Sequence, residues 1–506
     1  MNKYIMFTDM VGYSKLTGDD QNLALELLKE HDKIIEPIIK INKGSIVKRI
    51  GDAIVAIFDH SSNIIDSAVE IQRALKKRNI SNTKSRQIVI RIGLHYGEIT
   101  LKNDEVYGLG YDIASSIEPV AEFAGIAFSQ ELYDTSHHNN ELVINGSDNQ
   151  FFVRPVAEFT FKVCPDEVMV YKLYLSLLDW YDESHVQASS YLQKQNIKKQ
   201  IYKIKNFDFD IKRNTDHKKL ALHYLDEHNL SLSIYHFKMF KDQNQEKSLE
   251  IEFQIINIFC NIGLTRMVER LCKDLDQSYF VDYINGLNYF NAKDLTNSQI
   301  KFENVLEQKN VTSYFIDSIL YLLIIYFKNQ DYHKGVDLLS FHEKIFKNHI
   351  LKNQINHIKK IFEDFKNNLF NDQIMIDNDF SNIEVNTRSK NYLFLFWFYI
   401  QYNQKLNKTE DALIYQNYSR ELINNLTNKI SGHQLKETFN QSPFLHQMLM
   451  EDIDIVFNSN DLSDDLVDID IDLNTDENIF KFCFECGFNN SKSFKFCPSC
   501  GNKLTK

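Results

Sequence analysis

Hydrophobic and polar positions follow two different periods in the first 175 residues. Alternating apolar and polar positions predict strands, and apolar positions three or four residues apart predict helices that cover a sheet. This pattern predicts helices at residues 19–40, 64–78 and 112–123. It predicts strands at residues 4–8, 46–50, 53–58, 87–94, 151–161 and 168–173. The order indicates a β-α-β-β-α-β core with additions, which is the α+β ferredoxin-like arrangement.

Glycine and proline mark the end of this first domain, which we place at residues 1–175. Ten of the 16 glycines and four of the six prolines precede residue 176, so the stretch 176–450 has few breakers and is predicted to be helical throughout. The sequence of residues 289–294 recurs at 326–331, a period of 37, and residues 399–413 form a looser third copy. This period is close to the roughly 34 residues of tetratricopeptide repeats, so we expect stacked helix pairs of that kind. An irregular helical bundle is the alternative.

Residues 451–480 form a separate acidic segment. Eleven acidic and no basic residues occur between 451 and 477, which is typical of a solvated, disordered linker. Apolar and acidic residues alternate from 467 to 473, so this stretch could instead add as a strand to the edge of a partner's sheet.

Residues 481–506 carry two C-x-x-C knuckles, each followed by glycine. Four thiolates in this arrangement suit a closed, tetrahedral Zn²⁺ site, and the segment resembles the short zinc ribbons found at the ends of many bacterial and archaeal chains. We expect the zinc to be structural and the ribbon to require it for folding. A pair of disulfides is the alternative. The predicted zinc ligands are Cys483, Cys486, Cys497 and Cys500.

Bulk properties restrict the class of protein. A net charge of −12 without a strong basic stripe argues against a nucleic-acid partner. The longest apolar candidate, residues 392–400, is too short to span a bilayer, so no membrane span is expected. The first predicted strand begins at residue 4, which leaves no room for a signal peptide. We therefore expect a cytoplasmic protein, in which the scattered Cys164, Cys260 and Cys272 stay reduced and buried.

Two aspartates are the strongest candidates for chemistry. Asp9 and Asp52 each lie where an apolar strand meets a turn that contains glycine. A carboxylate at a strand end is more often a turn former than a ligand. Two carboxylates at such positions, however, are what a protein needs to present Mg²⁺ to phosphates, since water and substrate oxygens complete the coordination.

Four motifs in order resemble the catalytic domain of class III adenylate and guanylate cyclases. They occupy residues 7–14, 48–58, 91–98 and 106–116. The resemblance implies conversion of a nucleoside triphosphate, most simply ATP, to a 3′,5′-cyclic nucleotide and pyrophosphate. It also implies two Mg²⁺ or Mn²⁺ ions per site and a site formed between two catalytic domains arranged head to tail.

The resemblance assigns roles to individual residues. Asp9, Asp52 and the carbonyl of Met10 match the metal ligands of the family. Lys48 matches the lysine that contacts the base in adenylate-type enzymes, and Glu105 falls where those enzymes carry the second base contact. Guanylate-type enzymes have Glu and Cys at these two positions. The matches to phosphate-binding positions are the loop Val11, Gly12, Tyr13 and Ser14 and the later residue Lys162.

The sequence departs from the family at two catalytic positions. The family has Asn, and four residues later Arg, in the helix after the Tyr-Gly-x-Gly turn, whereas this chain has Asp112 and Ser116. The Asn orients the ribose, and the Arg stabilises charge on the α-phosphate. Loss of one such electrostatic group costs about 10²–10³ in rate. The half of the site donated to a partner is therefore impaired, unless Arg49, Arg91 or Arg154 fills the gap.

Three interpretations remain open from the sequence. The chain is a homodimeric cyclase, the metal-supplying half of a heterodimer, or a nucleotide sensor or signalling scaffold without catalysis. A cyclase that makes a pyrimidine product is a variant of the first. In each case we expect the helical region to bind an unidentified protein partner and to set the geometry of the cyclase dimer.

Overall fold

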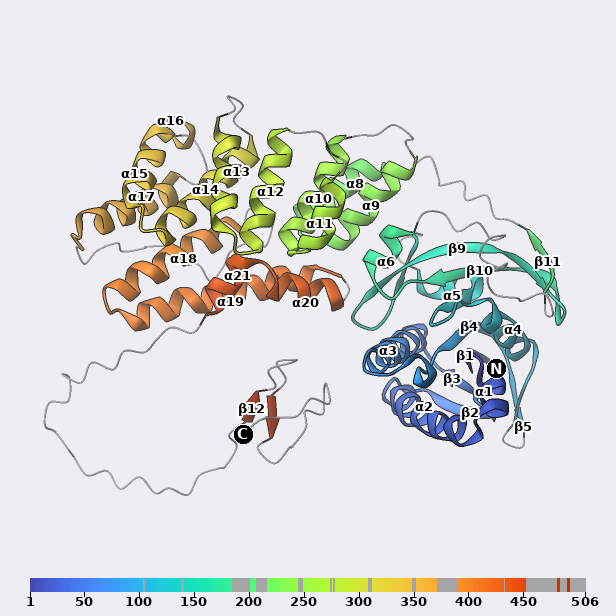
Figure 1. The fold of residues 1–506 in the computed structure, drawn as a ribbon. Helices are drawn as coiled ribbons and strands as arrows, with labels where there is room; N and C mark the ends of the chain where they lie inside the picture. The colour runs from blue at the N-terminus through green and yellow to red at the C-terminus, as the bar shows by residue number, and fades with distance from the viewer. Residues whose placement is uncertain are drawn as a thin grey trace, which may run out of the picture. The chain divides into compact units, whose positions relative to one another are not determined.

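The computed structural model divides the chain into two compact units, Met1–Asp454 and Ile455–Lys506 (Figure 1). Within them it describes residues 1–102, 105–137, 141–183, 201–205, 216–243, 249–273, 275, 278–307, 312–347, 352–370, 390–431, 433–451, 480–482 and 489–491. Statements about structure below concern these residues.

A nine-stranded sheet forms the N-terminal domain. Its strand order is β11-β9-β10-β7-β4-β1-β3-β2, and β8 pairs with β9 outside this path. Neighbouring strands are antiparallel except β4 and β7, which are parallel. The strands are β1 (Asn2–Met10), β2 (Ser45–Ile50), β3 (Ala53–Phe58), β4 (Ile90–Glu98), β7 (Ile126–Ser129), β8 (Val143–Asn145), β9 (Gln150–Phe161), β10 (Cys164–Leu173) and β11 (Ile201–Lys205). A separate small ribbon pairs β5 (Thr100–Lys102) with β6 (Glu105–Tyr107).

Both faces of the centre of the sheet are covered by other elements. Alternate residues of β1 point to opposite faces, so the side chains of this strand enter two different cores. Met6 and Met10 join the apolar core under α2 (Gln21–Ile41) and α3 (Ser61–Ile80). Ile5 and Phe7 join a second core with Ala114 of α4 (Leu109–Ile117). All six residues of β3 are buried, as expected for a strand between two covered faces.

The elements predicted in the N-terminal domain are present with shifted ends. Asp20 begins α2 as its N-cap, with its side chain accepting from the Leu23 N–H at 2.9 Å. The helix predicted to run to residue 123 ends at Ile117, because Pro119 has no N–H to continue it and the chain enters a short 3₁₀ helix, η2 (Glu118–Val120). Not predicted were β5 to β8, α1 (Tyr13–Asp19) and α5 (Gln130–Ser136), whereas α6 (Leu177–Asp182) lies in the stretch predicted to be helical.

The prediction that the chain is helical throughout from residue 176 was wrong at one place. β11 pairs with β9, antiparallel to it, so the sheet receives a strand from beyond the predicted boundary at 175.

From His217 to Met450 the described residues are helical and form successive pairs, so the predicted order of an α+β domain followed by a helical region is confirmed. The pairs are α8 (His217–Asp226) with α9 (Leu230–Gln243), α10 (Leu249–Ile262) with α11 (Thr265–Cys272), α12 (Tyr279–Asn291) with α13 (Leu295–Leu306), α14 (Ser313–Lys328) with α15 (Tyr332–Phe341), and α18 (Lys390–Lys405) with α19 (Thr409–Lys429). The remaining helices are α16 (Glu343–Phe346), α17 (Lys352–Asn367), α20 (His433–Gln441) and α21 (Phe444–Met450).

The sequence repeat at 289–294 and 326–331 is the turn that joins the two helices of a pair. In the first copy the Asp294 N–H donates to the Tyr289 carbonyl at 2.9 Å, and Lys293 adopts a left-handed φ of 65°. The second copy has the same bond from Asp331 to Tyr326 at 2.8 Å. This six-to-one bond after a left-handed residue is a Schellman helix end. The structure thus explains the repeat as a recurring helix-pair turn, and its assignment to tetratricopeptide repeats stays a prediction.

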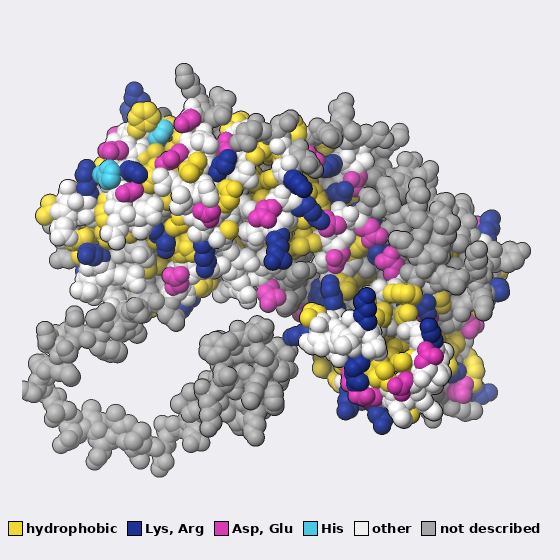
Figure 2. Space-filling model, viewed as in Figure 1, with side chains coloured by type: hydrophobic (Ala, Val, Ile, Leu, Met, Phe, Trp, Pro, Cys, Tyr) yellow, Lys and Arg dark blue, Asp and Glu magenta, His cyan; other side chains and the backbone are white. Residues whose placement is uncertain are grey.

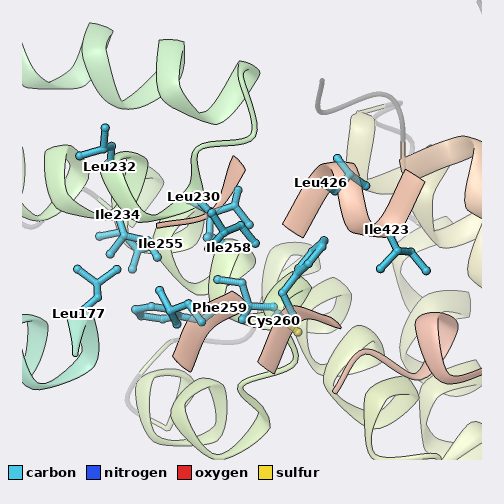
Figure 3. Packing of buried hydrophobic residues seen from close by; sticks show 14 of the residues in the cluster. Leu177, Leu230, Leu232, Ile234, Ile255, Ile258, Phe259, Cys260, Ile423 and Leu426 are labelled. Atoms are coloured by element: carbon cyan, nitrogen blue, oxygen red, sulfur yellow. The ribbon is translucent and has the colours of Figure 1, made fainter. Parts of the chain in front are cut away.

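A continuous set of buried apolar residues joins the α+β domain to the helical region. Figure 3 shows part of it, from Leu177 of α6 past Ile234 of α9 and Ile255 of α10. Polar contacts accompany it: the Leu142 N–H donates to the Tyr235 hydroxyl at 3.1 Å, and the Ser431 hydroxyl donates to Gln150 Oε1 at 3.0 Å. These two parts of Met1–Asp454 are therefore packed together.

Charges of both signs are interspersed on the face of the molecule shown in Figure 2, and no continuous basic stripe crosses that face. None of the described helices is both long enough and apolar enough to cross a lipid bilayer.

In the C-terminal unit, β12 (Phe480–Phe482) pairs antiparallel with β13 (Asn489–Ser491). The predicted zinc ligands Cys483, Cys486, Cys497 and Cys500, and the acidic segment 452–479, lie outside the described residues.

Candidate active site

The two candidate metal ligands lie at the same end of the sheet. Asp9 is the second-last residue of β1, and Asp52 lies in the turn between β2 and β3, where Gly51 supplies the left-handed φ of 63°. Strand β3 is paired with β1 so that Ile54 is opposite Thr8. This register brings Asp52 to the end of β1, where its Oδ2 accepts a hydrogen bond from the Met10 N–H at 2.9 Å.

The electrostatics of this end of the sheet suit a cation. Burial raises the pKa of the half-buried Asp52 carboxyl, and the nearby Asp9 carboxylate raises it further. Backbone N–H groups of Asp52 and Met10 oppose the rise in this pKa. Two neighbouring carboxylates that disfavour each other's charge are stabilised by a divalent ion between them. Asp9, Asp52 and the Met10 carbonyl are therefore a donor set that fits Mg²⁺ or Mn²⁺.

Arg91 is a third charged group at this site. It lies opposite Asp9 in the pairing of β1 with β4, and its Nη2 is 3.0 Å from Asp9 Oδ2. On its other side its Nε is 2.6 Å from Oε1 of Glu118, which is buried. Burial raises the pKa of Glu118 to about 8, although the Arg91 contact acts to lower it. Arg91 is thus held between two carboxyl groups of its own domain.

The predicted phosphate loop directly follows β1. Gly12 has a left-handed φ of 79° and precedes the short helix α1, so the chain reverses over Val11, Gly12, Tyr13 and Ser14. The Val11 N–H donates to the Val89 carbonyl at 2.8 Å, so the Val11 amide is already bonded within the protein. The first N–H groups of α1 lack partners within the helix, as at the start of any helix.

The two predicted base contacts are neighbours. Lys48 Nζ lies 3.5 Å from Glu105 Oε2, and the Tyr107 hydroxyl donates to the same oxygen at 2.7 Å. The Tyr107 hydrogen bond and Lys48 lower the pKa of the Glu105 carboxyl. The ring of Tyr111 lies 5.5 Å from Lys48 Nζ. A cation, an anion and two aromatic rings thus meet beside the turn that carries Asp52.

The residues that depart from the family pattern lie on α4. Asp112 is in the first turn of this helix, and Ser116 lies one turn later. The Ser116 side chain is buried, and its hydroxyl donates to the Asp112 carbonyl at 2.8 Å. This side chain therefore bonds to the backbone of its own helix and supplies no positive charge.

The remaining candidate cations have other partners or positions. Arg49 forms ion pairs with Asp32 and Glu36 on α2. Arg154 is buried against Trp180, with its guanidinium 4.5 Å from the centre of the indole ring. Lys162 lies in the exposed turn between β9 and β10, and three strands separate β9 from β1 in the sheet. Within one chain, the structure does not bring Lys162 to the two aspartates.

Sequence reasoning missed Glu118, and it named Arg91 only as a spare cation. The two are 27 positions apart and meet because η2 lies on β4 at Gly93. A Cβ atom at Gly93 would come within 2.4 Å of the Glu118 backbone nitrogen. A glycine inside a predicted strand often marks the close approach of another backbone, so Gly93 was the feature of the sequence that indicated this contact.

Comparison with known proteins agrees with this geometry for the N-terminal third of the chain. Residues 2–173 match the sequence profile of the adenylate and guanylate cyclase catalytic domain. A protein named putative adenylate cyclase 3, from Rhizobium meliloti, is 30% identical over 139 residues, which are 27% of this chain and 24% of the relative. A protein named adenylate cyclase, from Streptomyces griseus, is 22% identical over 134 residues, which are 25% of this chain and 32% of the relative.

The similarity to other proteins is local. The chain matches about a quarter of the length of the Rhizobium protein, and it matches 16% of a serine/threonine-protein kinase, pkn2, from Myxococcus xanthus at 26% identity. Among solved structures, an adenylate/guanylate cyclase/hydrolase from Silicibacter pomeroyi matches 34% of this chain and 96% of its own, with 25% identity and a TM-score of 0.31. The sequence-profile match makes residues 2–173 similar to cyclase catalytic domains, and these matches leave the helical region unassigned.

Proposed function

We propose that this protein is a nucleotide cyclase that converts a nucleoside triphosphate, in the first instance ATP, to a 3′,5′-cyclic nucleotide and pyrophosphate. The observation that carries the proposal is the meeting of Asp9 and Asp52 at one end of the sheet, with the Met10 N–H fixing Asp52. A domain without phosphate chemistry has no need of a second carboxylate that raises the pKa of Asp52.

Asp9, Asp52 and the Met10 carbonyl would hold two Mg²⁺ or Mn²⁺ ions. When bound, such ions neutralise phosphate charge and make the ribose 3′-hydroxyl easier to deprotonate. The protein's own contribution is to fix the ligands. The Met10 N–H orients the Asp52 carboxylate, and Arg91 holds one oxygen of Asp9. Rigid carboxylates lose little freedom when they bind, which favours productive alignment of the phosphate chain.

The neighbouring Lys48 and Glu105 would read the base. An ammonium donates to the N1 atom of adenine, and a carboxylate accepts from the exocyclic N6 amine. The pKa of Glu105 is lowered by Tyr107 and Lys48, so this side chain is an acceptor at neutral pH. This pair favours adenine over guanine, whose corresponding edge presents a carbonyl and an N–H. Lys48 would have to exchange part of its contact with Glu105 for the base.

The active unit would be a dimer of the N-terminal domain. Lys162 lies three strands away from β1 in the sheet, so a phosphate contact from it to Asp9 and Asp52 requires a second domain. The helical region, packed on the α+β domain through Tyr235 and Ser431, would then set the geometry of the dimer and bind a regulatory protein partner. A zinc ribbon with Cys483, Cys486, Cys497 and Cys500 would be a further interaction module.

One observation favours a second candidate function. Ser116 faces its own helix and Arg91 is held by Asp9 and Glu118, so within the described part of one chain neither supplies the cation expected from α4. Such a chain would keep the metal ligands Asp9 and Asp52 but would donate Asp112 and Ser116 in place of the family's Asn and Arg. It would work as one subunit of a heterodimer, or as a nucleotide sensor without turnover.

The test is incubation of the purified chain with ATP, GTP, CTP and UTP, each with Mg²⁺ and with Mn²⁺, followed by mass spectrometry for cyclic nucleotides. Asp52→Ala is the blank. A cyclic product that is absent with Asp52→Ala supports the cyclase, and its base tests the role of Lys48 and Glu105. If the folded, dimeric chain forms no product from any nucleotide, the homodimeric enzyme is excluded and the second candidate stands.

A further inference from the structure

A cavity of about 720 Å³ lies within the helical region. Its lining residues come from α8, α9, α10, α12, α14 and α18 to α21 and from the turns beside them. None of its lining residues belongs to the N-terminal domain, so it is distinct from the site of Asp9 and Asp52. Cavities of about 300–1,000 Å³ are the size of small-molecule sites in proteins.

The walls of the cavity are apolar and partly aromatic. Figure 3 shows Leu230 beside Ile258, with Leu426 coming from α19, and all three line the cavity. Aromatic rings come from three other helices of the helical region, namely Tyr314 and Tyr321 of α14, Phe394 of α18 and Phe439 of α20. Walls of this kind favour a ligand with apolar or aromatic surface.

Amide side chains form one stripe along the wall. Gln254, Asn257 and Asn261 lie on α10 at spacings of three and four residues, which places them on one face of the helix. Asn261 Nδ2 donates to Asn257 Oδ1 at 2.9 Å, and Gln254 Nε2 donates to the Tyr314 hydroxyl at 3.4 Å. Amides both donate and accept hydrogen bonds, so this stripe suits a polar but uncharged partner.

His228 gives independent evidence that the cavity takes a ligand. It lines the cavity, its side chain is 8% exposed, and its Nε2 has no hydrogen-bond partner among the described residues. A buried polar atom without a partner costs about 1–3 kcal/mol. A hydrogen bond from a ligand would remove that cost.

The charges around the cavity are largely neutralised. Asp317 is paired with Lys390 at 2.7 Å, and it also accepts from the Tyr283 hydroxyl. Burial lowers the pKa of His228 to about 3 and that of His446 to about 4, so both rings are neutral at pH 7. The other charged lining residue, Asp226, is exposed to solvent. A charged ligand would find no unpaired opposite charge in the buried wall and would lose its hydration there.

We propose that this cavity binds an uncharged, partly aromatic small molecule that carries hydrogen-bond donors and acceptors. The aromatic and apolar walls take its body, and the α10 amides and His228 fix its orientation. The proposal does not depend on cyclase activity, because its site and its test are confined to the helical region.

The test uses Nile red, an uncharged aromatic dye with hydrogen-bond acceptors, titrated into the full chain and followed by fluorescence. Asn257→Trp fills the cavity from a half-buried position, and Ile300→Trp on α13, half exposed and outside the cavity, is the matched control. We expect saturable binding at one site with a blue shift. Affinity should fall at least tenfold in Asn257→Trp and stay unchanged in Ile300→Trp.

Thermal unfolding midpoints show whether each variant is folded. If Asn257→Trp is not folded, Asn261→Phe is used instead to fill the cavity. An anionic dye, 8-anilinonaphthalene-1-sulfonate, tests the charge argument, and we expect that it does not displace Nile red at equal concentration. Three results would each overturn the proposal: no saturable binding, equal affinity in a folded filling variant and the wild type, or displacement by the anionic dye.

Discussion

The Arg91 guanidinium lies 3.0 Å from the Asp9 carboxylate, measured from Nη2 to Oδ2, across directly paired positions of β4 and β1. Its other side contacts the buried Glu118. One arginine thus links a candidate metal ligand to a carboxyl group in the interior of the domain. When no metal ion is bound, the positive charge of Arg91 balances the Asp9 carboxylate. Arg91 is therefore a positioning residue that fixes the orientation of this candidate ligand.

The first prediction concerns this buried contact. Arg91→Leu should lower the free energy of unfolding by about 1–3 kcal/mol, because the buried Glu118 carboxyl loses its hydrogen-bond partner. The double variant Arg91→Leu with Glu118→Leu should recover most of the loss, since replacing both partners of a buried hydrogen bond by apolar side chains costs little. Urea unfolding of the variants measures both values. A double variant as unstable as the single one would show that packing of Arg91, and not its hydrogen bond to Glu118, sets its importance.

The second prediction concerns the base. In the wild type, kcat/KM should be higher for ATP than for GTP. Replacing Lys48→Glu together with Glu105→Cys introduces the guanylate-type pattern and should lower kcat/KM for ATP by about 10²-fold, because the polar edge of adenine loses both hydrogen-bond partners. The ratio of GTP to ATP turnover should rise. The exposed Lys40→Glu is the control and should leave the ratio as it is. An unchanged ratio in the double variant would exclude Lys48 and Glu105 from base recognition.

The third prediction concerns Asp112. A carboxylate at this position of α4 repels the triphosphate that a partner domain presents to it, so Asp112→Asn should raise kcat several-fold. Steady-state kinetics with Mn²⁺ and ATP measure the change, with Asp134→Asn on the exposed side of α5 as a charge-matched control. A fall in kcat would mean that the Asp112 carboxylate contributes to substrate binding, contrary to the argument above.

The fourth prediction concerns pH and the helical region. Burial lowers the pKa of His446 to about 4 from its ordinary 6.5, while its Nδ1 bonds to the Phe439 carbonyl. Between these pH values the unfolded chain binds a proton that the folded chain does not, so stability is present above pH 6.5 and is lost as the pH falls. At pH 5 the loss from this group is about 2 kcal/mol. Urea unfolding at pH 7.5 and pH 5 should show a smaller loss in His446→Gln than in the wild type or in exposed His333→Gln. Equal losses in all three would refute this assignment.

Local signals made much of the N-terminal domain predictable. The hairpin around Asp52 has its ends within one residue of the prediction, because Gly51 fixes the turn and each strand has a clear apolar run. Helix α4 was predicted too long, although Pro119 was visible in the sequence. β7 was missed because a four-residue apolar run after a turn does not distinguish strand from helix.

The rest depends on tertiary contacts that no local pattern encodes. β11 becomes a strand because β9 offers it an edge. Arg91 and Glu118 meet only once η2 lies on β4, and the cavity exists only after nine of the described helices have packed around His228 and its neighbours. The sequence does point to the two aspartates, and its resemblance to the cyclases points to Lys48 and Glu105 as candidate contacts to the base. It does not show where Lys162 lies relative to them.

We propose that Asp52, held by the Met10 N–H, supports nucleotide cyclisation. The most direct measurement is the rate of cyclic AMP formation from ATP and Mn²⁺ by the wild type, Asp52→Asn and Asp59→Asn, in which Asp59 is an exposed carboxylate paired with Lys3. We predict measurable turnover in the wild type and Asp59→Asn, and at least about a 10²-fold loss in a folded Asp52→Asn. Equal rates in all three proteins would exclude this role of Asp52, and no cyclic product from the wild type would exclude the proposed activity.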